Sequence, residues 1–172
     1  MLTDHPHFFT ATIFKHQHLL QSYTYKQIVM ESLRFLVLKG RITLYAFVLM
    51  PNHIHLIWQM KGKSIYSDVQ RDFLKFTAQQ FRFDMLATGN PELKNYEVNL
   101  RDRKYQFWKC NSVSIPLSTS EIVKKKLEYI HTNPLKEKWN LAVNPENYKY
   151  SSAAFYHWHM DDLDMLTDYT KI

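Results

Sequence analysis

The sequence predicts an α+β domain in which helices pack on an antiparallel sheet. Three observations indicate this fold class. Two strand patterns are separated only by Pro51-Asn52, helical periodicities lie on both sides of that pair, and no linker or internal repeat divides the 172 residues. Because the link between the two strand patterns is so short, we expect the strands to be antiparallel neighbours.

Four segments are expected to form the strands of the sheet. Residues 7–14 are rich in aromatic and β-branched side chains. Residues 42–49 are almost continuously apolar, which predicts a strand in the centre of the sheet. Residues 53–59 follow at once as the third strand, and residues 104–115 form a fourth that ends at Pro116.

Three segments have the spacing of amphipathic helices. Residues 25–39 carry one apolar face and stop at Gly40. The pattern over residues 64–86 is longer, and its apolar positions are Ile65, Val69, Phe73, Phe76 and Phe83. A third helix is expected to open at the capping box Ser118-Thr119-Ser120-Glu121 and to end at about Asn133, since Pro134 lacks the backbone donor that would continue it.

Composition favours one folded, basic domain. The length suits a single core over residues 1–172, divided into a core of about 1–143 and a C-terminal extension of about 144–172. No apolar window approaches a membrane span, and Met1–His7 lacks the pattern of a signal peptide. The single cysteine, Cys110, fits a reducing cytoplasm. A net charge of +6 with 15% aromatic residues suits single-stranded nucleic acid, where phosphates pair and bases stack.

His53 and His55 are separated by one residue on the third expected strand. Side chains alternate between the faces of a strand, so both imidazoles and Ile57 share one face. Two neutral imidazoles side by side supply two ligands of a divalent-metal site, which needs a third from elsewhere. The alternative interpretation of this motif is that the two histidines lie on a half-buried strand and bind no metal.

Tyr129 lies on the third expected helix, in the stretch Tyr-Ile-His-Thr-Asn-Pro. Helical geometry places Tyr129 and Asn133 on one face because they are four residues apart, at the edge of the apolar stripe. His131 is two residues from the tyrosine and therefore points nearly the opposite way. Asn133 is thus better placed than His131 to meet the two strand histidines, and an ordinary amphipathic tyrosine is the alternative for Tyr129.

These motifs together resemble the HUH-type single-tyrosine transposases, most closely the REP-associated tyrosine transposases, which are related to the insertion-sequence-200 transposases. The resemblance rests on 49–55 (Leu-Met-Pro-Asn-His-Ile-His) and 127–134 (Leu-Glu-Tyr-Ile-His-Thr-Asn-Pro). It extends to Phe8-Phe9-Thr10, Phe107-Trp108-Lys109 and 148–152 (Tyr-Lys-Tyr-Ser-Ser). Each motif is short, and their order and spacing make the match specific over most of the chain.

The resemblance implies a ferredoxin-like or RRM-like sheet with the histidines on a central strand and the tyrosine helix across its face. It also implies a metal-dependent single-stranded DNA endonuclease and strand transferase that acts on hairpin DNA. Tyr129 would be the nucleophile of a 5′-phosphotyrosine intermediate, and His53, His55 and Asn133 would bind Mg²⁺ or Mn²⁺. The family commonly has glutamine at the last position, so with the shorter asparagine the helix must approach more closely or a water must intervene.

The DNA-binding residues expected from charge and resemblance are few. Lys75 lies on the second expected helix, where the family resemblance places a lysine near the active site. Lys15 is a further candidate for a phosphate contact, and Lys109 and Arg103 are added from their charge alone. Arg71 lies one turn from Lys75, and a solvated basic face is the preferred interpretation for it. The expected partner is single-stranded or hairpin DNA rather than a membrane, and the relatives leave open both a monomer and a homodimer.

Two other functions are compatible with parts of the sequence. A non-catalytic nucleic-acid-binding module of RRM-like fold would need the basic and aromatic residues but would not need His53, His55 and Tyr129 together. A metal-dependent hydrolase with water as its nucleophile would need a carboxylate ligand, and no Asp or Glu lies at an obvious spacing. Formation or absence of a covalent protein–DNA adduct distinguishes these functions from the transferase.

Overall fold

The computed structural model describes residues 5–172, so the first four residues of the stretch Met1–His7 lie outside the described chain. Its centre is a four-stranded antiparallel sheet with the order β2-β3-β1-β6. The strands are β1 (His7–Thr12), β2 (Ile42–Met50), β3 (His53–Met60) and β6 (Val113–Pro116). Helix α1 (Tyr23–Leu38) joins β1 to β2, and α2 (Tyr66–Thr88) lies between β3 and β6. This β-α-β-β-α-β order confirms the α+β, ferredoxin-like prediction, with the histidine motif on the central strand β3.

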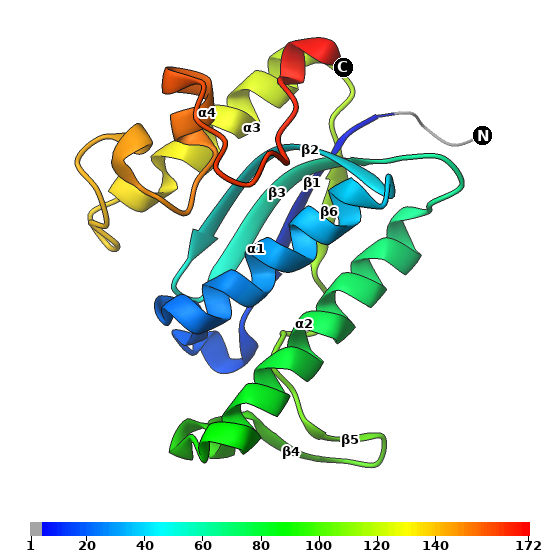
Figure 1. Ribbon diagram of the computed structural model, residues 1–172, viewed down its shortest axis with the longest axis vertical. Helices are drawn as coiled ribbons and strands as arrows, with labels where there is room; N and C mark the ends of the chain where they lie inside the picture. Colours follow the sequence, from blue (N-terminus) through cyan, green and yellow to red (C-terminus); the bar gives the residue numbers. More distant parts are fainter. Residues whose placement is uncertain (1–4) are drawn as a thin grey trace.

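The helices cover both faces of the sheet (Figure 1). Helices α1 and α2 pack on one face, where Phe9, Ile54 and Trp58 are fully buried. Helix α3 (Ser120–Thr132) lies across the other face, and its Val123, Leu127 and Ile130 pack on a second apolar cluster there. The two strand periodicities therefore give two separate cores, and the third helix is the element that meets the histidine face.

The prediction that β2 is central in the sheet is wrong. Strand β2 is an edge strand, and a C-terminal segment covers its free edge (Figure 1, red and orange). The backbone N–H of Leu49 donates to Tyr150 O at 2.9 Å, and Ser152 N–H donates to Phe47 O at 3.0 Å. Further along, Thr167 N–H donates to Leu44 O at 2.9 Å. A continuously apolar strand indicates two covered faces and says nothing of its place in the order, which explains the error.

Three of the five apolar positions predicted for this helix are also wrong, and one of them, Ile65, is the N-cap of α2 and is 42% exposed. The side chains of Phe76 and Phe83 are 50% and 55% exposed, while Thr77, Phe81 and Met85 are buried. The core side of this half of α2 is therefore rotated by about one residue from the predicted stripe, because one helical position turns the face by ~100°. Thr77 is tolerated inside because its hydroxyl donates to Phe73 O at 2.9 Å and accepts from the Trp108 indole N–H at 2.9 Å.

The expected strand over residues 104–115 is interrupted. Its first part forms β5 (Arg103–Tyr105), which pairs with β4 (Glu97–Leu100) in a separate hairpin, and its last part forms β6. Asn111 lies between them with φ +64°, a left-handed conformation that breaks an extended strand. The residues between α2 and β5 form β4 and a short 3-10 helix.

Short elements complete the chain. The N-cap of α3 is Thr119, whose hydroxyl accepts from Ile122 N–H at 3.2 Å, one residue later than the predicted capping box places it. Helix α4 (Ala153–Trp158) follows near the C-terminus. The 3-10 helices are η1 (Phe14–His16), η2 (Leu19–Gln21), η3 (Pro91–Tyr96), η4 (Asn133–Leu135), η5 (Pro145–Asn147) and η6 (Tyr169–Lys171). Within residues 5–172, no helix has the length and apolar character needed to cross a membrane.

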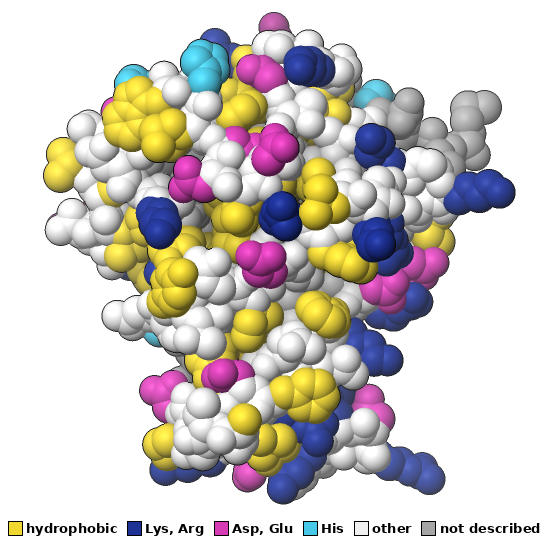
Figure 2. Space-filling view, in the orientation of Figure 1, with side chains coloured by type: hydrophobic (Ala, Val, Ile, Leu, Met, Phe, Trp, Pro, Cys, Tyr) yellow, Lys and Arg dark blue, Asp and Glu magenta, His cyan; other side chains and the backbone are white. Residues whose placement is uncertain are grey.

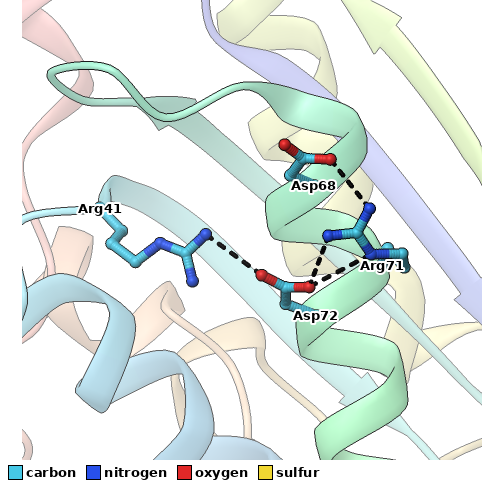
Figure 3. A network of polar contacts seen from close by, with 4 residues as sticks. All are labelled: Arg41, Asp68, Arg71 and Asp72. Atoms are coloured by element: carbon cyan, nitrogen blue, oxygen red, sulfur yellow. Dashed lines mark hydrogen bonds and ion pairs between the residues drawn. The ribbon is translucent and has the colours of Figure 1, made fainter.

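An ion-pair network joins the start of β2 to α2 (Figure 3). Arg71 contacts Asp68 and Asp72, each at 3.0 Å, and Arg41 contacts Asp72 at 3.4 Å. The Arg71 guanidinium and its bond to Asp72 hold the pKa of that carboxyl below its usual range. Since the pairs are exposed, they contribute little stability, but they neutralise Arg71 and agree with its interpretation as a solvated surface residue.

Candidate active site

The two strand histidines lie on the face of β3 that α3 covers. Their neighbours Ile54 and Leu56 are fully buried on the opposite face, as the alternation along the strand predicts. The imidazole rings of His53 and His55 lie with centroids 4.8 Å apart and nearly perpendicular planes. His55 is 5% exposed, so the pair lies at the floor of the site.

Each histidine is held through its Nδ1 atom. His53 Nδ1 lies 2.7 Å from Asn52 Oδ1, an atom that only accepts, so Nδ1 carries the proton and donates it. His55 Nδ1 lies 2.7 Å from Thr10 Oγ1 on the neighbouring strand β1. With its proton on Nδ1, His53 turns the Nε2 lone pair toward the site, and the Thr10 hydroxyl is able to accept a proton from His55 Nδ1 in the same way, which is the arrangement that metal-binding histidines use.

Helix α3 brings Tyr129 and Asn133 to these histidines. The ring centroids of Tyr129 and His55 are 5.3 Å apart, with the planes at 66°. Asn133 is 2% exposed, and its amide Nδ2 donates to His53 Nε2 at 3.3 Å. The shorter asparagine is accommodated by a close approach of the helix, and rotation of the carboxamide would turn its Oδ1 toward the same nitrogen.

His131 points away from this group. Its Nε2 lies 2.8 Å from Ser152 Oγ, and its ring is 5.6 Å from that of Tyr156. Burial lowers the pKa of His131 to about 4, so the side chain is neutral at pH 7. As the helical spacing indicates, His131 serves the packing of α3 against the C-terminal segment and does not join His53 and His55.

Burial and positive neighbours keep the two strand histidines neutral. Burial, followed by Lys138 and Lys136, lowers the pKa of His53 to about 4. Burial, followed by His53, Lys136 and Lys126, lowers the pKa of His55 to about 3. At neutral pH both imidazoles are therefore unprotonated, so a metal ion would not have to displace a proton from either of them.

Two lysines flank the tyrosine. Lys136 Nζ lies 4.3 Å from the centroid of the Tyr129 ring. Lys126 Nζ lies 5.6 Å from the same centroid and 4.6 Å from that of Phe8. Within residues 5–172 neither lysine takes part in an ion pair, and no carboxylate contributes to the pKa of His53 or His55. The described part of the chain also holds no cluster of three His, Cys, Asp or Glu residues.

Aromatic rings border the site on two sides. Phe8 stacks on His55 with centroids 5.1 Å apart and contacts the edge of Tyr129. Trp139 lies 5.8 Å from His53 and 5.7 Å from His18, between centroids. These rings exclude water from part of the site and offer flat apolar surfaces beside the polar atoms.

Three of the four expected DNA-binding residues line one groove. The groove, of about 650 Å³, lies between α2 and residues 102–112, and Lys75, Arg103 and Lys109 are among its lining residues. Lys and Arg side chains gather over the β4–β5 hairpin and the adjoining side of α2 in Figure 2 (lower right). Arg103 is paired with Asp102 at 2.9 Å, whereas no ion pair in the described chain involves Lys75 or Lys109.

One wall of the groove is connected to strand β1, the neighbour of the histidine strand. Trp108 forms an antiparallel bridge with Ile13, and Lys109 N–H donates to Thr12 O at 2.7 Å. Thr12 is in turn paired with His53. The backbone of residue 109 therefore lies about two strand spacings, roughly 10 Å, from that of His53. The other wall of the groove is α2, which packs on the face of the sheet opposite the histidines. Lys15 lies apart from the groove, exposed in η1.

The sequence interpretation missed five residues of the site. Lys126 lies three residues before Tyr129, which is same-face helical spacing and could have identified it. Lys136 follows the end of α3, and only the path of the chain through η4 brings it to the tyrosine. Trp139 had no signal, because its position depends on the turn after η4. Thr10 and Asn52 could not be found either, since only the register of β1 on β3 and the turn before His53 bring them to the imidazoles.

Comparison with solved structures defines the class of fold. The chain has the fold of a REP-associated tyrosine transposase whose structure was solved bound to a REP hairpin, with a TM-score of 0.64 and 18% identity over 96% of this chain and 87% of that one. A second similar structure is a Deinococcus radiodurans protein provisionally assigned as a transposase, with a TM-score of 0.46 and 18% identity over 73% of this chain and 86% of that one. No protein-family model and no curated protein matches the chain.

Proposed function

We propose that the chain is an HUH-type single-tyrosine transposase, a metal-dependent enzyme that cuts and joins single-stranded DNA through a 5′-phosphotyrosine intermediate. The observation that carries the proposal is the meeting of Tyr129 with His55, at 5.3 Å between ring centroids, in a fold shared with a REP-associated tyrosine transposase. A non-catalytic binding module has no need for a half-exposed tyrosine beside two Nδ1-anchored histidines.

The donor set supports a divalent metal ion. His53 and His55 would contribute Nε2 atoms, and Asn133 would contribute its carboxamide oxygen. Imidazole and amide oxygen, completed by phosphate oxygens, suit Mg²⁺ or Mn²⁺, and the two nitrogen ligands favour manganese. A metal ion bound there would withdraw charge from the scissile phosphate and orient its oxygens for in-line attack.

The chain's own part in the reaction begins with Tyr129. Its Oη would attack the phosphorus as the bond from phosphorus to the 3′-oxygen breaks, so that one phosphodiester is exchanged for another. The tyrosine proton leaves to solvent, and the departing 3′-oxygen takes up a proton. Because the new bond retains the phosphodiester energy, a second 3′-hydroxyl can attack it and join strands without ATP.

The substrate proposed is hairpin or single-stranded DNA. The related structure was solved with a REP hairpin, and the groove of Lys75, Arg103 and Lys109 gives this chain a basic surface that suits a phosphate backbone. The meeting of Tyr129 with His53 and His55 within one chain supports a proposed active site built by a single protomer. We further propose a cytoplasmic protein with a catalytic core of residues 1–143 and an extension of 144–172.

A denaturing gel tests the proposal. The protein is mixed with an end-labelled library of single-stranded hairpins, with Mn²⁺ or with EDTA, beside Tyr129→Phe. We expect a shifted protein–DNA band that requires Mn²⁺ and Tyr129. Cleavage without an adduct that survives Tyr129→Phe would indicate a hydrolase that uses water, and binding with neither product would indicate a binding module.

A further inference from the structure

The candidate metal site lies in an unusually positive environment for a cation. Lys126 and Lys136 lie within 5.6 Å and 4.3 Å of the Tyr129 ring, and both act on His55 through space. Lys138 acts on His53 in the same way. No carboxylate joins the histidines in the described part of the chain, so the candidate ligands are all neutral. A divalent cation entering the empty protein would therefore be repelled by the lysines without any compensating anion.

The same arrangement becomes favourable when a phosphodiester is present. Its negative oxygens would neutralise the ammonium groups and would also complete the coordination of the metal. Lys126 precedes Tyr129 by one turn of α3, and Lys136 follows η4. Both ammonium groups lie near the ring of Tyr129, a residue that is 40% exposed. His53 and His55 lie deeper in the site, where His55 is only 5% exposed.

We propose that Lys126 and Lys136 form a seat for the scissile phosphate beside Tyr129, and that this phosphate allows the metal to bind, so that metal and DNA bind cooperatively. The inference rests on the proposed function, whose nucleophile and metal ligands it uses. It assigns to each lysine an interaction with a phosphate oxygen. It also implies that the free protein binds metal weakly, because the two ammonium groups repel the cation until a phosphate neutralises them.

The first test needs no DNA. Mn²⁺ affinity is measured by electron paramagnetic resonance on the free protein, for the wild type, for the double variant Lys126→Met/Lys136→Met, and for Lys125→Met. Lys125 is the exposed neighbour on the same helix and controls for loss of one charge. Removal of the two ammonium groups is expected to tighten Mn²⁺ binding by roughly 3- to 10-fold, while Lys125→Met leaves it within error. Unchanged affinity in the double variant would overturn the inference.

The second test measures coupling without catalysis. Tyr129→Phe cannot form the adduct, so its Mn²⁺ affinity can be measured with and without a saturating hairpin pool. The pool is expected to raise the Mn²⁺ affinity by about 10-fold or more, and to have a much smaller effect when Lys126→Met and Lys136→Met are added. If DNA leaves the Mn²⁺ affinity of Tyr129→Phe unchanged, metal and phosphate do not share a site and the inference fails.

The third test separates this inference from the proposed function. With a hairpin that the wild type cleaves, Lys136→Met is expected to slow single-turnover adduct formation by about 10²-fold, and Lys136→Arg to recover most of the rate because it keeps the charge. A wild-type adduct with an unchanged Lys136→Met rate would refute the phosphate seat and leave the transposase function intact. Absence of any wild-type adduct would refute the function, and the Mn²⁺ measurements would still decide the coupling.

Discussion

His55 and Tyr129 face each other across the boundary between the sheet and helix α3, with 5.3 Å between their ring centroids. His55 is almost completely buried, whereas Tyr129 is 40% exposed. The histidine is therefore fixed by its surroundings, and the tyrosine keeps its hydroxyl accessible to a large substrate. This asymmetry suits the roles proposed for the two residues, with Tyr129 as the nucleophile and His55 as an anchored metal ligand.

The nucleophile assignment predicts a variant that is inactive but folded. Tyr129→Phe is expected to reduce covalent DNA adduct by about 10³-fold or more, because no other hydroxyl replaces the attacking oxygen. Its thermal unfolding midpoint should stay close to that of the wild type, since the side chain is half exposed. Tyr23→Phe, at a more exposed tyrosine of α1, is the matched control and should retain full adduct yield. Adduct formation by Tyr129→Phe would refute the assignment.

The Thr10 hydrogen bond predicts an effect on metal affinity from outside the ligand set. Thr10→Val keeps the shape of the side chain but removes the partner of His55 Nδ1, which lies 2.7 Å away. We expect Mn²⁺ affinity, measured with saturating DNA, to fall by about 10- to 100-fold. Thr12→Val, two residues along the same face of β1, should leave it unchanged, because the Thr12 side chain makes no bond to either imidazole among the described contacts. Equal effects of both variants would indicate general destabilisation of β1.

The basic groove predicts a change in the salt dependence of DNA binding. Lys75→Gln and Lys109→Gln are each expected to weaken binding of a single-stranded oligonucleotide and to lower the slope of log K against log salt by about 0.7, the value for one lost phosphate contact on a single strand. Fluorescence anisotropy at four salt concentrations measures both quantities. Lys39→Gln, at the far end of α1, removes the same charge outside the groove and should leave the slope unchanged.

His131 predicts a loss of stability in mild acid. Its folded pKa of about 4 is lower than the ordinary value of 6.5, so the unfolded chain binds the proton first. The stability contributed by the neutral histidine is complete above pH 6.5 and is lost as the pH falls toward 4. Between pH 7.5 and 5 this group accounts for up to about 2 kcal/mol of the free energy of unfolding.

Urea unfolding of the wild type and of His131→Gln at the two pH values checks this prediction. The variant should be less stable at pH 7.5, because it loses packing against Ser152 and Tyr156, but its stability should fall less on acidification. His53 and His55 titrate in both proteins, so their contribution cancels in the comparison. An identical pH dependence of the two proteins would show that His131 is not responsible.

The parts of the fold that depend on local periodicity were predictable from the sequence. The alternation around His53 and His55 and the spacing of Tyr129 and Asn133 needed only the geometry of a strand and a helix. The edge position of β2 was not predictable. A run of apolar residues indicates that both faces of a strand are buried, but it does not indicate how many strands pair with it. The break at Asn111 was missed because aromatic residues before it and the β-branched Val113 and Ile115 after it favoured one continuous strand.

The candidate site divides in the same way. Its histidines, tyrosine and asparagine were identified from sequence. The residues that hydrogen-bond to the histidines and the lysines that surround the tyrosine were not. Thr10 depends on the register between two strands, and Lys136 depends on the path of the chain through η4 after Pro134. Such long-range relationships are set by packing of the whole domain, which a local pattern does not contain.

The C-terminal segment, residues 144–172, covers an edge of β2 that would otherwise be open to other chains. Without residues 144–172, the backbone groups of Phe47 and Leu49 that now bond to Ser152 and Tyr150 would be unpaired along a nine-residue apolar strand. An open, uncharged strand edge of this kind is a template on which other chains add in register. By pairing with the backbone of β2, residues 144–172 therefore oppose edge-to-edge association of the sheet that carries the histidines.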